Sequence, residues 1–192
     1  MPNWCDGELS VQGEPEILKR FVETVKGEKE ALDANKLIPY PEEWRKLDKL
    51  AQEWQDRWDA FLRSAMDSEG KIDDEKRKEL WKKFIAENGE QPEDGYNRGG
   101  YEWCIENWGT KWGFCHVEVF DEDIENGCVE YGFQTAWSPP IPLVKKMGEM
   151  FPELAFQLRY WECGAAFQGV LTIREGKVVD DWSGEYIGSR GG

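Results

Sequence analysis

The chain has 192 residues, with 39 acidic against 24 basic side chains, a formal net charge of −15, 40% hydrophobic and 14% aromatic residues. The apolar content is enough for a packed core and excludes a disordered chain. The charge argues against binding to nucleic-acid backbones or to anionic membrane surfaces, which both require clustered Lys and Arg. This net negative charge either keeps the protein soluble or attracts a basic partner.

The sequence also bears on compartment and cofactors. Residues 1–10 lack the basic segment and the apolar run of a secretory signal, and no apolar stretch approaches the length of a membrane span. Five cysteines without CxxC spacing predict reduced thiols, with neither a disulfide nor structural zinc. We therefore expect a cytoplasmic protein with no membrane association, no metal and no cofactor.

The chain opens with a predicted strand and a predicted helix. Residues 3–12 alternate between apolar and polar side chains, which is typical of a half-buried strand. Pro15 suits the first turn of a helix over residues 15–26, which carries one apolar stripe. Residues 35–41 contain two prolines, which exclude a central strand and a helix, so we predict an extended segment there.

Residues 42–94 differ from their surroundings. Apolar residues at helical spacing run from Trp44 to Ala65, and a second helix is predicted from Asp73 to Asn88. We interpret residues 42–94 as a helical hairpin inserted into a single domain that spans residues 1–192. The tryptophan stripe of its first helix could form a partner groove, but such stripes more often dock on the domain that they interrupt.

The second half of the chain returns to strand patterns. Residues 114–120 and 128–137 alternate on either side of an acidic turn at 121–127 that contains Asn-Gly, which predicts an antiparallel hairpin. The remaining predicted elements are a helix over 140–151, a strand over 154–162 and a terminal hairpin over 167–174 and 177–182.

Without the insertion, the order is strand, helix, strand, strand, helix, strand, followed by the terminal hairpin. This is the ferredoxin-like βαββαβ pattern. The predicted fold class is α+β, with an antiparallel sheet and helices 15–26 and 140–151 on one of its faces. A fold this common hosts unrelated activities and indicates no function.

Four blocks of sequence stand out: MPNWC, NKLIPYP, WCIENWGTKW and FQTAWSPP. Together they resemble the YubB-type family of phage and plasmid proteins. The resemblance implies a ferredoxin-like domain and a mobile-element product in a bacterial cytoplasm, and it implies no activity. It covers most of the chain apart from roughly residues 42 to 98, and Asp6 stands where the family usually has Asn.

The sequence predicts no catalytic residue and no metal ligand. Cys115 and His116 are strand neighbours, whose side chains point to opposite faces, so a Cys–His pair would need Cys104 or Cys128. Phosphate-binding glycine motifs are absent. A small enzyme that uses His116 or a cysteine is the alternative to a non-enzymatic protein.

Binding of single-stranded nucleic acid is a second alternative. Ferredoxin-like modules can stack bases on sheet aromatics, and Tyr131, Phe133 and Trp161 are the candidates here. However, Tyr131 and Phe133 share a face with Val129, which suits a core, and the chain lacks positive charge. We therefore expect no nucleic-acid partner.

The candidate partner-binding residues come from two stretches. Around ENWGTKW (residues 106–112), tryptophans either pack in the core with polar partners for their indole N–H groups, or form a binding hot spot. The segment from Glu118 to Glu130 holds six acids and no base. The candidates are Trp103, Asn107, Trp108, Lys111, Trp112, Trp137, Asp121, Glu122, Asp123 and Glu125.

The sequence thus predicts a non-enzymatic accessory protein that acts by binding another protein. In a more specific hypothesis, the chain inhibits a host defence or nucleic-acid-binding protein, and its acidic surface imitates phosphates. The identity of the partner and the oligomeric state stay open.

Overall fold

The structure is a computed structural model that describes residues 3–66 and 70–188. It divides into two compact units, one formed by Met1–Pro39 with Tyr101–Gly192 and the other by Tyr40–Gly100. We call them the sheet unit and the hairpin unit. The single domain that the sequence suggests stays a prediction.

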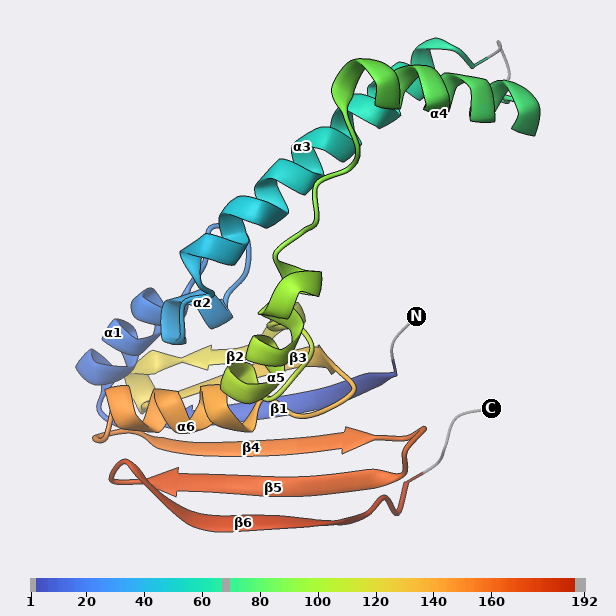
Figure 1. The fold of residues 1–192 in the computed structure, drawn as a ribbon. Helices are drawn as coiled ribbons and strands as arrows, with labels where there is room; N and C mark the ends of the chain where they lie inside the picture. The colour runs from blue at the N-terminus through green and yellow to red at the C-terminus, as the bar shows by residue number, and fades with distance from the viewer. Residues whose placement is uncertain (1–2, 67–69, 189–192) are drawn as a thin grey trace. The chain divides into compact units, whose positions relative to one another are not determined.

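The sheet unit holds every strand found among the described residues. Its elements are β1 (Trp4–Gln12), α1 (Pro15–Val25), α2 (Ala34–Leu37), α5 (Tyr101–Trp108), β2 (Cys115–Asp123), η2 (Ile124–Asn126), β3 (Cys128–Ala136), α6 (Ile141–Met150), β4 (Ala155–Glu162), β5 (Phe167–Arg174) and β6 (Lys177–Glu185). All paired strands are antiparallel, in the order β2-β3-β1-β4-β5-β6 (Figure 1). The first four strands in this order have the ferredoxin-like arrangement, and β5 and β6 extend the sheet beyond β4. The predicted fold is confirmed.

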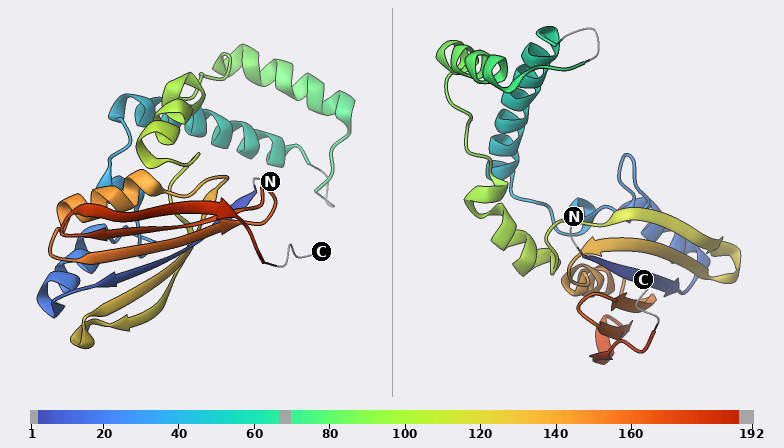
Figure 2. Two further views of the ribbon diagram at one scale, coloured as in Figure 1. Left: turned by 90° about the horizontal axis from the view of Figure 1, so that it is seen from below. Right: turned by 90° about the vertical axis from the view of Figure 1, so that its right-hand side faces the viewer.

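Helices α1 and α6 pack on one face of the twisted sheet (Figure 2). The ring of Phe21 in α1 lies 6.4 Å from that of Tyr131 in β3 and 5.5 Å from that of Phe156 in β4. In α6, a Cβ atom at Gly148 would lie 2.6 Å from Ile173 of β5, so this helix approaches the sheet closely. Burying each large apolar side chain contributes about 1.5–3 kcal/mol. The opposite face of the sheet is not covered by these two helices.

Two helices of the sheet unit were missed by the sequence analysis. Residues 35–41 are not extended throughout, because Ala34–Leu37 form one helical turn. Its N-terminus is capped by Asp33, whose side chain accepts a hydrogen bond of 2.9 Å from the Asn35 backbone N–H. The turn ends before Pro39, so the prolines exclude helix only downstream of it. The eight residues of α5 were likewise assigned to no element.

Strand β2 departs from the predicted alternation. It is an edge strand with two irregularities in its pairing to β3, between Cys115 and Glu118 and between Val119 and Asp121. His116 has a backbone φ of 49°, a value that residues other than Gly rarely adopt. Bulges are common on edge strands because they interrupt only one ladder. The strand also continues to Asp123, into the predicted turn.

The hairpin unit contains α3 (Glu42–Ser64), α4 (Asp74–Asn88) and a short turn, η1 (Tyr96–Gly100). The buried rings of α3 pack against α4: the centroid of Trp54 lies 5.2 Å from that of Phe84, and Trp58 lies 5.3 Å from the same ring. The Trp54 indole N–H donates to the Gly89 carbonyl at 3.3 Å. The tryptophan stripe therefore meets the second helix of the hairpin, a contact that the sequence analysis did not foresee.

The cysteines in the structure are all free thiols, and one of them makes stability depend on pH. Burial raises the pKa of the Cys5 thiol to about 12, with the charges of Asp6 and Glu162 adding to the effect. An unfolded cysteine ionises near pH 8.5. The contribution of Cys5 to stability is therefore complete below about pH 8.5 and is lost as the pH rises toward 12.

We expect the free energy of unfolding to fall by up to about 1.4 kcal/mol per pH unit above pH 9 through this group. Urea unfolding between pH 7 and pH 10 tests the effect, because Cys5→Ala should lose part of the alkaline decline. The half-exposed Cys163 gives the matched control, Cys163→Ala. Equal pH slopes for the wild type and Cys5→Ala would contradict the expectation.

Candidate binding surface

Hydrogen bonds tie residues 108–112 to two other segments of the sheet unit, the end of α2 and the end of β3. The indole N–H of Trp108, a residue only 6% exposed, donates to the Ile38 carbonyl at 2.8 Å. The fully buried hydroxyl of Thr110 donates to the carbonyl of Ala136, at the end of β3, at 2.9 Å. Such polar anchors are what buried indoles and hydroxyls require. Trp108 is thus part of the packed structure.

Three candidate residues meet at this end of the sheet. The Lys111 Nζ lies 4.8 Å from the ring centroids of both Trp112 and Trp137, within the range of cation–π attraction. Trp137 is 48% exposed and has a φ of 72°, an unusual conformation for an aromatic residue. This cluster of Lys111, Trp112 and Trp137 presents an aromatic surface next to the first residues of β1.

The two other candidates of this stretch lie on α5. The ring of Trp103 is 5.4 Å from that of Trp108, edge to face. The Asn107 side-chain amide donates to the Trp103 carbonyl, four residues earlier, at 2.9 Å. Both contacts are local to the helix and its neighbouring turn.

The acidic candidates lie at the opposite end of the β2–β3 hairpin. Strand β3 has nine residues and separates the turn from the tryptophans by roughly 27 Å. Asp123 has a local role, because its carboxylate accepts hydrogen bonds from the backbone and side-chain amides of Asn126. The predicted set therefore forms two separate groups: one contains Trp103, Asn107, Trp108, Lys111, Trp112 and Trp137, and the other contains Asp121, Glu122, Asp123 and Glu125.

Between these groups extends the sheet face that α1 and α6 do not cover, which we call the open face. Strand register aligns its side chains in three rows. The rows are Asp121, Glu130, Ser10, Gln157, Thr172 and Asp180; Glu118, Gly132, Glu8, Arg159, Val170 and Trp182; and Gln134, Asp6, Trp161, Gln168 and Gly184.

The open face is strongly acidic. Its rows hold six carboxylates, those of Asp6, Glu8, Glu118, Asp121, Glu130 and Asp180, but a single Lys or Arg, which is Arg159. Arg159 lies 3.7 Å from Glu8, which leaves the other five carboxylates without a cation in these rows. Arg174 and Lys177 lie beyond the rows, next to the turn between β5 and β6. The face therefore has a negative field that a basic surface would complement.

Exposed aromatic rings accompany the carboxylates. Phe120 is 57% exposed, and its ring lies so close over Gly132 that a Cβ atom there would be 2.0 Å from it. Trp182 is 49% exposed at the β6 end of the central row, and the half-buried Trp161 lies on β4 in the third row. Two shallow hollows of about 290 and 330 Å³ adjoin Phe120. The open face thus carries both acidic groups and exposed aromatic rings.

A chain of hydrogen bonds fixes the orientation of His116. The Gln134 amide donates to Asp6 Oδ1 at 2.9 Å, which leaves its Oε1 to accept from His116 Nδ1 at 2.7 Å. The carboxylate of Asp6 only accepts when ionised, so the order of donors is determined. Trp4 packs edge-on against the imidazole, with centroids 5.2 Å apart.

Strand register does not bring Cys128 to His116, because Cys128 pairs with Asp123 at the far end of the hairpin. Cys104, the other cysteine suggested as a partner, is buried on α5. The suggested base-stacking residues are also divided, since Tyr131 and Phe133 are 1% and 4% exposed and belong to the core. Trp161 alone of these three lies on the open face.

Two further observations concern the described part of the chain. None of its helices combines the length and the apolar character needed to cross a bilayer. Residues 3–66 and 70–188 also contain no group of three His, Cys, Asp or Glu side chains placed to hold a metal ion.

Comparison with known proteins supports the fold. Residues 116–190 match the family model described as the ferredoxin-like domain in Api92-like protein. A crystal structure of the protein api92 from Yersinia pseudotuberculosis is similar, with a TM-score of 0.53 and 12% sequence identity over 98% of this chain and 99% of that one. At this identity the likeness concerns the fold, and its coverage includes the hairpin unit. No curated protein matches the chain.

The open face was missed because each strand contributes only two or three of its residues. The alternation in β1 did separate Asp6, Glu8 and Ser10 from the buried Cys5 and Leu9. Without the strand order, however, these polar residues could not be aligned with those of β3 and β4.

Proposed function

We propose that the protein is a non-enzymatic accessory that binds a partner protein, and that its open face receives a basic surface of this partner. The observation that carries the proposal is the ratio of six carboxylates to one arginine on a sheet face that also exposes Phe120 and Trp182. Interfaces commonly combine aromatic anchors with a charged surround, and the charge pattern selects the partner.

The more specific form of the proposal concerns a partner that itself binds nucleic acid. The basic site of such a protein is built to meet rows of phosphates. Alternate residues of one strand, such as Asp6 and Glu8, are about 6.6 Å apart along the backbone. Their carboxylates therefore also form a line of negative charge. The resemblance to YubB-type proteins of phages and plasmids supports a place in a bacterial cytoplasm, where inhibition of a host defence protein fits a mobile element.

The enzymatic alternative has one supporting feature, the oriented His116. Its Nδ1 donates to Gln134, so a neutral ring would present Nε2 as a proton acceptor. The residues that line the adjacent hollow include no Ser, Thr or Cys to act as a nucleophile. The geometry thus supports an oriented base with no hydroxyl or thiol nucleophile in this lining.

The proposal is tested by capture of proteins from a bacterial lysate at low salt. A face variant that combines Glu118→Gln, Glu130→Gln and Asp180→Asn removes three charges from the rows. Its matched control combines Glu23→Gln, Glu28→Gln and Glu153→Gln, which are exposed elsewhere in the sheet unit. We expect the wild type and the control to retain the same partner, and the face variant to retain much less of it. Equal retention by all three proteins would contradict the proposal.

A further inference from the structure

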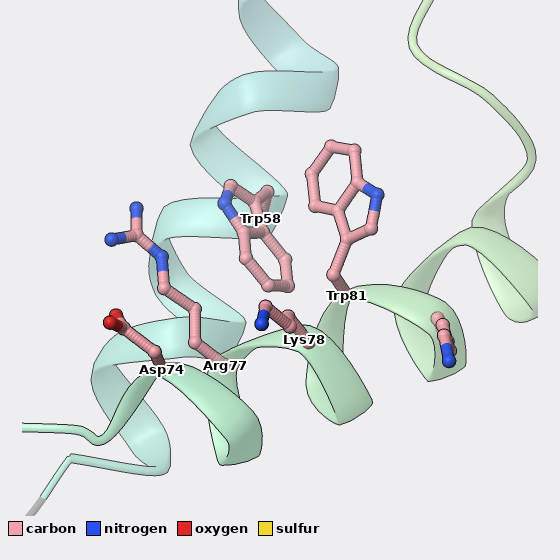
Figure 3. A pocket seen from close by; sticks show the side chains of 6 residues that line it. Trp58, Asp74, Arg77, Lys78 and Trp81 are labelled. Carbon is pink, nitrogen blue, oxygen red and sulfur yellow. The ribbon is translucent and has the colours of Figure 1, made fainter.

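A second surface of opposite charge lies in the hairpin unit. Helices α3 and α4 border a pocket of about 480 Å³. Figure 3 shows its lining, in which Trp58 comes from α3 and the other residues from α4. The lining residues are Trp58, Asp74, Arg77, Lys78, Trp81 and Lys82.

The floor of the pocket is aromatic. Trp58 is 5% exposed, whereas Trp81 is 39% exposed, and the two rings meet edge to face with centroids 4.9 Å apart. The ring of Trp54 also packs edge to face against that of Trp81, at a centroid distance of 5.5 Å. The rings are therefore held by packing and offer an apolar contact surface with a fixed shape.

The rim of the pocket is basic. Lys78 is paired with Glu75 at 2.9 Å, but the side chains of Arg77 and Lys82 make no ion pair or hydrogen bond with any residue that the structure describes. Three cations face one carboxylate, that of Asp74. In a chain with a net charge of −15, this combination of unpaired cations and apolar floor indicates an anionic ligand with an apolar part.

We infer that the pocket binds an acidic peptide segment of a partner protein, with an apolar side chain on Trp58 and Trp81 and carboxylates at Arg77 and Lys82. The two cations are five residues apart on α4, about 7.5 Å along the helix axis, so they suit two separate carboxylates. The arginine can hold a carboxylate through two parallel hydrogen bonds.

The alternative ligand, single-stranded nucleic acid, fits less well. Backbone binding needs a continuous row of cations. Residues 40–100 contain twelve basic and sixteen acidic residues, a net charge of −4, and Asp74 faces the pocket itself. This site belongs to the hairpin unit and the open face to the sheet unit, and their charges are opposite, so a protein with both would hold one basic and one acidic partner.

The test uses fluorescence anisotropy of a labelled acidic amphipathic peptide, rich in Leu and Glu, with the full-length protein. The pocket variant combines Arg77→Gln and Lys82→Gln. The matched control combines Lys76→Gln and Lys83→Gln, which remove the same charge from the same helix outside the pocket. We expect the pocket variant to bind the peptide roughly three- to tenfold more weakly and the control to bind like the wild type. The same peptide with Gln in place of Glu should bind weakly to all three proteins.

Three outcomes would overturn the inference. The wild type could fail to bind the peptide, or the two double variants could lose affinity equally, which would indicate general charge attraction. Tighter binding of labelled single-stranded DNA, with the same dependence on Arg77 and Lys82, would assign the pocket to nucleic acid. Loss of binding by Trp81→Ala, with an unchanged circular dichroism spectrum, would support the contact with the aromatic floor.

Discussion

Replacement of Trp108 by Ala is expected to lower the free energy of unfolding by about 3–5 kcal/mol. The substitution empties a site in which the ring is 6% exposed, and it leaves the Ile38 carbonyl without its 2.8 Å donor. It also removes the ring that packs against Trp103. Urea unfolding followed by circular dichroism measures the change.

Two variants separate the sources of this effect. Trp108→Phe keeps an aromatic ring and loses the indole N–H, so it should cost clearly less than Ala. Trp137→Ala truncates a tryptophan that is 48% exposed and should change stability by no more than about 1 kcal/mol. If Trp108→Ala kept wild-type stability but lost a partner, the residue would be a binding hot spot and its structural role would be disproved.

Replacement of Gly109 by Ala is expected to cost about 2–4 kcal/mol, because two penalties combine. Gly109 has a φ of +78°, a region that disfavours every side chain. A Cβ atom there would lie 2.5 Å from Pro142 Cδ, at the start of α6, and 3.2 Å from the Pro139 carbonyl oxygen. Neither neighbour can move easily, since one is a proline ring and the other is backbone.

Gly70→Ala provides the matched control for Gly109. Gly70 has a similar φ of +74°, but no atom of residues 3–66 or 70–188 outside its chain neighbours lies within 4 Å of the position of a Cβ, so it serves as the reporter of backbone strain. We expect it to cost about 1 kcal/mol. Equal costs at the two positions, measured by urea unfolding, would show that the contact with α6 is not tight.

The sequence predicts the sheet unit well because its strands alternate and its helices carry continuous stripes. Residues such as Leu9 and Phe21 define their faces through local periodicity alone. The short helices at Ala34–Leu37 and Tyr101–Trp108 span too few turns to show such a period. In β2, the irregularities between Cys115 and Glu118 and between Val119 and Asp121 shift the pattern, and no local signal marks them.

The candidate surfaces were less predictable, since they depend on strand order and helix pairing. Glu8 and Arg159 are neighbours only because β1 pairs with β4. The pocket at Trp58 and Trp81 likewise requires the α3–α4 contact. The tryptophan-rich stretch at residues 106–112 and the acidic turn at residues 121–127 could be recognised in the sequence from their composition. The structure places them at the two ends of the open face.

The most direct test of the open face is the association rate of the captured partner as a function of salt concentration. Steering by charge acts mainly on this rate and is screened beyond about 10 Å at 0.1 M salt. We predict a steep fall with salt for the wild type and for the Glu23, Glu28 and Glu153 control. The Glu118, Glu130 and Asp180 face variant should associate about tenfold more slowly at low salt, with a clearly shallower slope. Identical rates and slopes for the face variant and the wild type would contradict the account.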